Sequence, residues 1–321
     1  MLLLDDTKPM PQQEIRVALI GECMLELQGQ AFGTLEQTYG GDTLNTAVYL
    51  ARCGAKSGLR AYYATGLGED GLSSGLMQRW AADGLDLSLV RRIPGRLPGM
   101  YLIETDERGE RSFSYWRDTS AAKAYFDTDT TPLEQGLAQW HALYLSGISL
   151  AILPPSGRER LFALMQGLRE RGATVVFDNN YRPRLWPDVG EARRCYARAF
   201  ELASMALITA DDHQALMGLA SVPDAVAAAQ TLPPAELVIK RGAAATLVLG
   251  PGASWQEAPT ETVSRVVDTT AAGDSFAAGY LSRRLAGASA FDAACFGNRL
   301  AARVIQHRGA LIAPQLMADL L

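Results

Sequence analysis

The sequence predicts an α/β fold in which helices flank a central, mostly parallel β-sheet. Short aliphatic or β-branched runs recur along the chain, at residues 15–20, 142–145, 174–177, 205–208, 237–239 and 246–249. Runs this short and apolar throughout are typical of buried parallel strands. Helical patterns lie between them, and strands that alternate with helices form βαβ units.

The helices are predicted from the spacing of apolar residues. Positions i, i+3, i+4 and i+7 are apolar in residues 44–51 and again in 161–168. Near the C-terminus, apolar pairs four residues apart predict two further helices, around 276–280 and 300–305. Each pattern gives a helix with one apolar face, which would cover the sheet.

One region departs from this alternation. In residues 99–117, two β-rich arms flank a polar turn at 106–109, which predicts an antiparallel hairpin. Residues 22–39 also carry alternating apolar positions broken by glycines. Together the two segments predict a small β-sheet that serves as a lid or a dimer surface. The alternative is an edge meander with no moving part.

The length and composition set the class of protein. The 321 residues suggest two domains or one large α/β domain. We expect a single domain over 14–321, with 1–13 as a flexible N-terminus. A net charge of −5 argues against a nucleic-acid partner, and no apolar run is long enough to span a membrane. The four cysteines are widely separated, which fits a cytoplasmic location.

The most informative segment is 267–280, VDTTAAGDSFAAGY, where a turn of small residues leads into a helix. The backbone amides of Ala272, Gly273 and Asp274 would lie unpaired at the helix N-terminus and form an anion hole. Asp274 would accept a proton from an attacking hydroxyl group. The alternative is that Asp274 only caps the helix.

This segment resembles the second signature of the ribokinase/PfkB family of carbohydrate kinases. Residues 40–55 are similar to the family's first signature, and residues 240–249 to its late strand pair. Within the family the chain is most similar to 2-keto-3-deoxygluconate kinases, on the stretches 99–101, 109–117 and 179–186 and on the AAGD form of the turn. The resemblance implies a ribokinase-like fold and the cofactors ATP and Mg²⁺.

The resemblance also implies the site residues. It gives Asp274 as the base, with the amides of Gly273 and Ala272 stabilising the transferred group. It gives substrate contacts to Gly41, Asp42, Asn45, Tyr101, Tyr115, Arg117, Arg182 and Asp274. It gives nucleotide contacts to Asn180, Arg182, Lys240, Arg241, Gly242, Ala245, Ala271, Ala272, Gly273 and Asn298, the last expected to open the late helix.

Two positions depart from the family pattern. Ala271 stands where the family usually has glycine, and a methyl group there forbids backbone angles that only glycine adopts. The family's N-x-x-E motif has ADDH, residues 210–213, as its counterpart. Asp211 or Asp212 would supply its carboxylate, which the family links to magnesium through water, or would only cap a helix. No direct metal ligands are predicted, because the three histidines are scattered.

The charge of the proposed site bears on its substrate. A sugar acid brings a carboxylate that is costly to desolvate without a partner, and the planar guanidinium of arginine pairs two oxygens at once. Arg117 shares a strand face with Tyr115, and Arg182 follows a strand end. The alternatives are a solvated Arg117, paired with Asp118 or Glu104, and a surface Arg182.

These observations predict ATP-dependent phosphorylation of the terminal hydroxyl group of 2-keto-3-deoxygluconate. The alternatives are a kinase for a neutral sugar such as fructose or ribose, or a non-catalytic sugar-binding protein. A dehydrogenase is disfavoured because no G-x-G-x-x-G follows the first strand. The expected partners are a small sugar acid and ATP, with a homo-oligomer formed through the lid.

Overall fold

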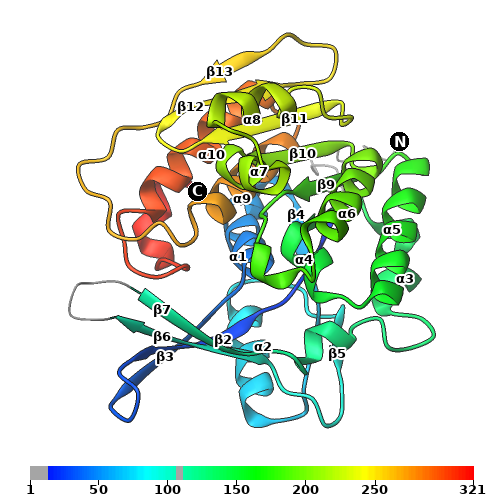
Figure 1. Cartoon of the computed structure of the whole chain (residues 1–321), viewed down its shortest axis with the longest axis vertical. Coiled ribbons are helices and arrows are strands. Elements are labelled where there is room, and N and C mark those ends of the chain that lie inside the picture. The colour runs from blue at the N-terminus through cyan, green and yellow to red at the C-terminus, as the bar shows by residue number, and fades with distance from the viewer. Residues whose placement is uncertain (1–13, 106–110) are drawn as a thin grey trace, which may run out of the picture.

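Nine strands form the main sheet, in the order β13-β12-β11-β10-β9-β8-β1-β4-β5 (Figure 1). The computed structural model describes residues 14–105 and 111–321, so the expected flexible terminus and the turn at 106–109 lie outside the described residues. The strands from β11 to β5 pair in parallel, and β12 and β13 are antiparallel, which confirms a mostly parallel sheet. Their bounds are β1 Ile15–Ile20, β4 Leu59–Leu67, β5 Val90–Arg92, β8 Ala142–Ser146, β9 Thr174–Asp178, β10 Met205–Thr209, β11 Glu236–Arg241, β12 Ala244–Leu249 and β13 Gln256–Ala258.

Helices cover both faces of this sheet. In β1, Val17 and Leu19 face one hydrophobic cluster while Ala18 and Ile20 face another, as the two-residue period of a strand requires. The first cluster contains α1 (Asp42–Gly54), α2 (Gly71–Ala82), α9 (Ala272–Arg284) and α10 (Ala290–Val304). The second contains α3 (Pro132–Gln135), α4 (Gly147–Ile152), α5 (Pro155–Glu170), α6 (Val189–Leu202), α7 (Ala210–Met217) and α8 (Val222–Ala229).

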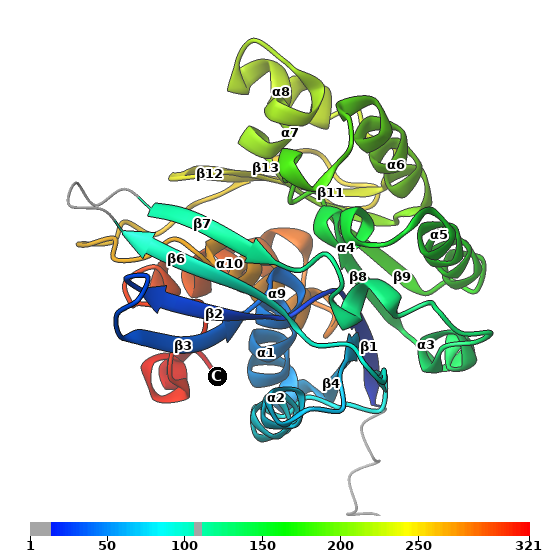
Figure 2. The same ribbon diagram turned by 60° about the horizontal axis from the view of Figure 1, so that its bottom comes forward.

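The four strands of the predicted lid form a second sheet, in the order β3-β2-β6-β7. They are β2 (Met24–Gly29), β3 (Leu35–Gly40), β6 (Gly99–Thr105) and β7 (Arg111–Trp116). The hairpin of β6 and β7 is antiparallel, with Tyr101 opposite Tyr115. Figure 2 shows this small sheet projecting from the body beside α1 and α9.

One long strand is absent from the predictions. β4 has the sequence LRAYYATGL, in which alanines, tyrosines and a glycine replace the usual aliphatic run. The strand ends with Gly66 and Leu67. A side chain at Gly66 would lie 2.2 Å from the carbonyl oxygen of Ala121, so the glycine permits a close approach of two segments.

The carboxyl ends of the parallel strands bring polar residues to one edge of the main sheet. Glu22 follows β1, Ser146 ends β8, Asp178 ends β9 and Lys240 lies near the end of β11. Ligands of open α/β sheets bind at this edge, and the small sheet joins the body at the same place. Within residues 14–105 and 111–321, no helix is long and apolar enough to cross a membrane.

Candidate active site

A cavity of about 770 Å³ lies between the small sheet and the N-termini of α1 and α9. It brings together residues far apart in the sequence, and every predicted substrate contact lines it. These residues are Gly41, Asp42, Asn45, Tyr101, Tyr115, Arg117, Arg182 and Asp274. Asn180, a predicted nucleotide contact, lines it too.

Asp274 is the third residue of α9 and faces this cavity. Asn45, on α1, donates a hydrogen bond from Nδ2 to Asp274 Oδ2 at 2.8 Å. The Thr46 hydroxyl group donates to the backbone carbonyl of Asp274 at 3.3 Å. Asp274 does not cap the helix, because the N-cap residue is Ala271. The first-signature helix therefore holds the carboxyl group of the second signature in place.

The Asp274 carboxyl group holds its proton unusually well. Burial raises its pKa from 3.8 to about 8, and the negative charges of Asp42 and Asp178 act in the same direction. The Asn45 hydrogen bond and the positive charge of Lys240 oppose the shift. A pKa near neutrality suits a group that takes up a proton during a reaction.

The start of α9 offers two free amides rather than the predicted three. The amides of Gly273 and Asp274 have no hydrogen-bond partner among the residues that the structure describes. The amide of Ala272 donates to the Thr269 carbonyl oxygen at 3.1 Å, so the prediction that it is unpaired is wrong: the turn before the helix closes on it. Ala271 has a φ of −113°, which any residue adopts, so its methyl group causes no strain.

Asp42 lies at the centre of a polar cluster at the start of α1. It is the first helical residue, and the N-cap is Gly41, so Asp42 is not the cap. Its Oδ2 accepts hydrogen bonds from the Ser146 hydroxyl at 2.5 Å and from Asn180 Nδ2 at 2.6 Å. Burial raises the pKa of Asp42, and Asp178 adds to the shift. A side chain at Gly41 would lie 2.2 Å from the Glu22 carbonyl oxygen, which leaves room only for glycine.

Arg117 is buried and paired, with 9% of its surface exposed. Its partner is Glu22, which is 3% exposed and follows β1. The alternative of a solvated Arg117 paired with Asp118 or Glu104 is therefore wrong. Arg117 Nε and Glu22 Oε1 are both buried without a hydrogen-bond partner in the described part of the chain. The pair thus keeps one donor and one acceptor unused beside the cavity.

Two tyrosines complete this end of the cavity. Tyr101 and Tyr115 lie on opposite arms of the hairpin, with ring centroids 5.7 Å apart. The Tyr101 hydroxyl group donates to Glu26. Burial, and next this hydrogen bond, raise the pKa of Tyr101 far above its ordinary value, so the hydroxyl group stays protonated and its oxygen can accept a further hydrogen bond.

Arg182 forms an ion pair with Asp212, 3.2 Å from Nη1 to Oδ1. Helix α7 begins at Ala210 with Thr209 as its N-cap, so neither Asp211 nor Asp212 caps it, and that alternative is wrong. Burial raises the pKa of Asp212 against the opposing charges of Arg182 and Lys240. Asp212, rather than the exposed Asp211, therefore lies near the charged side chains at the carboxyl ends of the parallel strands.

Lys240 connects the sheet to the start of α9. Its ammonium group pairs with Asp178 Oδ2 at 2.9 Å. A side chain at Gly273 would lie 3.6 Å from Lys240 Nζ, so this cation is close to the free amides. Gly242 has a φ of +62° in the turn between β11 and β12, a conformation that favours glycine.

Asn298 does not open a helix, and that expectation is wrong: it lies within α10. Its Nδ2 donates to the carbonyl oxygens of Ala258 and Pro259, at 3.2 and 3.0 Å. Its Oδ1 accepts from the Thr246 hydroxyl group at 2.9 Å. These bonds hold β12 and β13 against the helix and leave the side chain no free amide hydrogen.

The sequence reasoning overlooked four residues of this site: Glu22, Lys123, Ser146 and Asp178. Glu22, Ser146 and Asp178 lie at the carboxyl ends of strands, and that rule alone would have found them. Lys123 lies in a short 3-10 helix, Ala121–Ala124, and no motif marks it.

One cavity thus brings together a carboxyl group with a raised pKa and the side chains of Arg117 and Arg182. The chain matches the model of the pfkB family carbohydrate kinases over residues 14–316, and it belongs to that family. The resemblance seen in the motifs and the ribokinase-like fold are thereby confirmed.

Individual relatives agree with the finer resemblance. The 2-dehydro-3-deoxygluconokinase of Dickeya dadantii (strain 3937) is 46% identical over 304 residues, which cover 94% of this chain and 98% of the relative. The protein of the same name from Escherichia coli (strain K12) is 45% identical over 305 residues, with the same coverage. The crystal structure of aminoimidazole riboside kinase from Salmonella enterica, complexed with aminoimidazole riboside and an ATP analog, aligns with a TM-score of 0.80 at 25% identity. That alignment covers 95% of this chain and 99% of that one.

Proposed function

We propose that this chain transfers the γ-phosphoryl group of ATP to the terminal hydroxyl group of 2-keto-3-deoxygluconate, also called 2-dehydro-3-deoxygluconate. One observation carries the proposal: a single cavity has Asp274 and the start of α9 on its wall together with Arg117. Relatives with 45–46% identity are named as kinases of this acid, which supports the choice of substrate.

In the proposed reaction, the terminal oxygen of the sugar acid attacks the γ-phosphorus as the bond to the ADP oxygen breaks. The hydroxyl proton passes to the carboxylate of Asp274. The free amides of Gly273 and Asp274, with the ammonium group of Lys240 beside them, stabilise the charge on the transferred group. The Ala272 amide takes no part, because Thr269 already accepts its hydrogen.

The rest of the cavity binds the sugar acid in this proposal. Arg117 binds the carboxylate through the N–H groups that Glu22 leaves free, and Tyr115 donates to an oxygen nearby. Tyr101, whose hydrogen is donated to Glu26, accepts a hydrogen bond from a sugar hydroxyl group. Asp42 and Asn45 bind sugar hydroxyl groups, and Gly41 lets the backbone approach them. Arg182 completes this set from the loop after β9.

ATP lies against the start of α9 and the hairpin of β11 and β12 in the proposal, with contacts from Asn180, Arg182, Lys240, Arg241, Gly242, Ala245 and residues 271–273. Asn298 is left out, because its side chain is already engaged. The residues that the structure describes contain no cluster of three His, Cys, Asp or Glu side chains that would hold a metal. Mg²⁺ needs no such cluster, because it often binds one or two carboxylates together with substrate phosphates.

Asp212 and Asp178 are the carboxylates that fit Mg²⁺. Both lie near Lys240, and each pairs with a cation: Asp212 with Arg182 and Asp178 with Lys240. Positive and negative side chains therefore alternate at the carboxyl ends of these strands. Bound Mg²⁺ would offset the negative charge of the ATP phosphates there.

A kinase for a neutral sugar is the second candidate. The observation that favours it is the Glu22 carboxylate, which offsets the charge of Arg117. Steady-state rates of ATP consumption with 2-keto-3-deoxygluconate, its galactonate counterpart, fructose and ribose separate the candidates. We expect kcat/KM for an acid to exceed that for either neutral sugar by about 100-fold or more. Faster turnover of a neutral sugar would overturn the choice of substrate, and no turnover of any sugar would indicate a binding protein.

Assembly and location belong to the same proposal. The small sheet exposes Leu35, Phe113 and Trp116, which supports a homo-oligomer formed through it. The four cysteines are free, which fits the reducing cytoplasm. Light scattering on the purified protein tests the first point, and a monomer at micromolar concentration would contradict it.

A further inference from the structure

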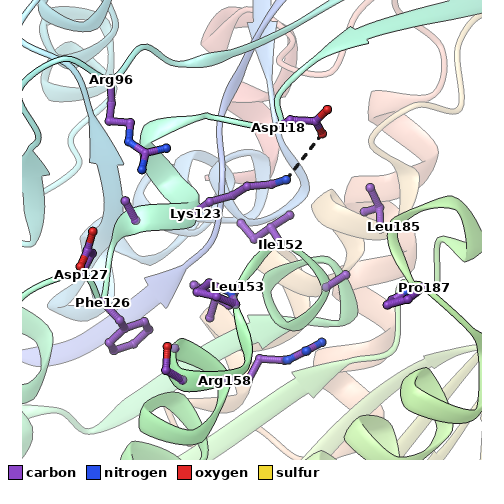
Figure 3. Close-up of a pocket in the computed structure, with 15 residues that line it drawn as sticks. Arg96, Asp118, Lys123, Phe126, Asp127, Ile152, Leu153, Arg158, Leu185 and Pro187 are labelled. Atoms are coloured by element: carbon purple, nitrogen blue, oxygen red, sulfur yellow. Dashed lines mark ion pairs between the residues drawn. The ribbon is translucent and has the colours of Figure 1, made fainter.

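The substrate cavity adjoins a second hollow of about 630 Å³ (Figure 3). The two share five lining residues: Asp118, Lys123, Ala151, Ile152 and Leu185. Lys123 therefore stands at the border between them. Figure 3 shows its side chain extending across Ile152 toward Asp118.

Four cations of the described chain line the substrate cavity; Arg184 is exposed, and the other three differ in how a carboxylate offsets their charge. Arg117 faces Glu22, whose side chain is 1% exposed, so water screens the pair little. Arg182 faces the half-buried Asp212. Among the residues that the structure describes, the one ion-pair partner of Lys123 is Asp118, at 3.8 Å from Nζ to Oδ1, and the Asp118 side chain is fully exposed. An exposed pair at this distance contributes little, so Lys123 keeps most of its charge for a ligand.

Lys123 also lies beside the end of the cavity that Arg117 forms. Lys123 and Arg117 both line the substrate cavity, and Asp118, the partner of Lys123, follows Arg117 directly in the chain. The Lys123 side chain is 30% exposed, and its ammonium group lies at the end of a flexible aliphatic stem. The ammonium group can therefore turn toward a bound anion.

We propose that Lys123 is a further substrate-binding residue, whose ammonium group leaves Asp118 and pairs with the carboxylate of the sugar acid beside Arg117. The inference rests on the proposed function and deepens it. It names anionic sugars as the substrate class, because Lys123 supplies the net positive charge that the pair of Arg117 and Glu22 lacks. A neutral sugar would gain nothing from this residue.

The test compares Lys123→Met with Lys123→Arg and with Arg96→Met. Methionine keeps the length of the stem without the charge. Arg96 lines only the second hollow, so its variant is the matched control for loss of a nearby cation. We expect Lys123→Met to raise KM for 2-keto-3-deoxygluconate tenfold or more, with kcat and KM for ATP within twofold. KM for 2-keto-3-deoxygluconate should stay within threefold of the wild-type value in Lys123→Arg and within twofold in Arg96→Met.

A neutral ketose separates a charge effect from a structural one. The inhibition constant of fructose, as a competitor of the acid, should be the same in wild type and Lys123→Met. An unchanged KM for the acid in Lys123→Met, or an equal weakening of fructose binding, would overturn the role of Lys123. A wild-type protein that turns over no sugar acid would instead overturn the proposed function. Calorimetry with the acid would then test Lys123 directly, and equal binding by wild type and Lys123→Met would overturn it.

Discussion

The two ends of the substrate cavity arrange their charges in opposite ways. At the α9 end, burial raises the pKa of Asp274 to about 8, and the like charges of Asp42 and Asp178 add to the shift. At the hairpin end, Arg117 is matched by the buried carboxylate of Glu22. Burial and neighbouring carboxylates raise the affinity of a carboxylate for a proton, whereas a buried ion pair holds a guanidinium group in one orientation. The first arrangement suits proton transfer and the second suits binding.

Asp274→Asn removes the proton acceptor and should have the largest effect. A positioned general base contributes about 100- to 10,000-fold to a rate, so we expect kcat to fall by roughly a thousandfold. KM for the sugar acid should change by less than about threefold, since the amide keeps the shape of the carboxyl group. Steady-state kinetics measure both, and turnover close to that of wild type would exclude Asp274 as the base.

Arg117→Ala removes the guanidinium group from the hairpin end of the substrate cavity. Charge-assisted hydrogen bonds contribute about 1.5–3 kcal/mol, so KM for the sugar acid should rise roughly 10- to 100-fold while KM for ATP stays constant. The variant also leaves Glu22 buried without its partner, which should lower the free energy of unfolding by about 3–5 kcal/mol.

The double variant Glu22→Ala with Arg117→Ala is the control for this loss of stability. It should recover much of the free energy of unfolding without recovering KM. Recovery of both would mean that Arg117 acts through the fold rather than on the substrate.

The pH dependence of kcat/KM tests the α9 end of the cavity without removing the proposed base, Asp274. Because Asp274 must be deprotonated, kcat/KM should rise about tenfold per pH unit below pH 8 and level off above it. Asp42→Asn removes a negative charge that raises the pKa of Asp274, so the inflection should move to lower pH. A profile that is flat from pH 6 to pH 9 would contradict this assignment of the proton.

The same carboxyl group should make stability depend on pH. Its pKa is about 8 in the folded chain against an ordinary value of 3.8, so the folded state binds more protons between these values. The stabilising contribution is fully present below about pH 4 and is lost as the pH rises through 8. In Asp274→Asn this dependence disappears, so the variant's melting temperature should exceed that of wild type by a margin that grows toward pH 8. A difference in melting temperature that stays constant between pH 4 and pH 8 would contradict the raised pKa of Asp274.

Ala271→Gly should have the smallest effect. The φ of Ala271 is open to both residues, so the glycine usual in the family is not needed for the turn. We expect kcat to stay within twofold, measured beside wild type. A large gain in kcat would mean that the methyl group obstructs the phosphate.

Much of the fold was predictable because its strands are short aliphatic runs. The runs at 15–20 and 205–208, for example, became β1 and β10. β4 was missed, since its burial depends on partners on both sides rather than on an aliphatic sequence. Local patterns report the period of an element and not the tertiary contacts that bury it.

The motifs predicted residues that the structure brings to one cavity. Asp274, Asn45 and Arg117 all reach one cavity, as the resemblance implied. The partners of these residues were not predictable, because they come from distant parts of the chain: Glu22 pairs with Arg117 across 95 positions. Whether a backbone amide is left unpaired also depends on how the preceding turn closes. The prediction for Ala272 failed for this reason, because its amide donates to the Thr269 carbonyl oxygen.

The most direct test of the central claim is the ³¹P NMR spectrum of the product formed from ATP and 2-keto-3-deoxygluconate. Transfer to the terminal hydroxyl group predicts a phosphomonoester signal split by the two protons of one CH₂ group, with almost none formed by Asp274→Asn. A signal split by a single proton would place the phosphate on another carbon. A phosphomonoester formed equally fast by Asp274→Asn would contradict the role of this carboxyl group.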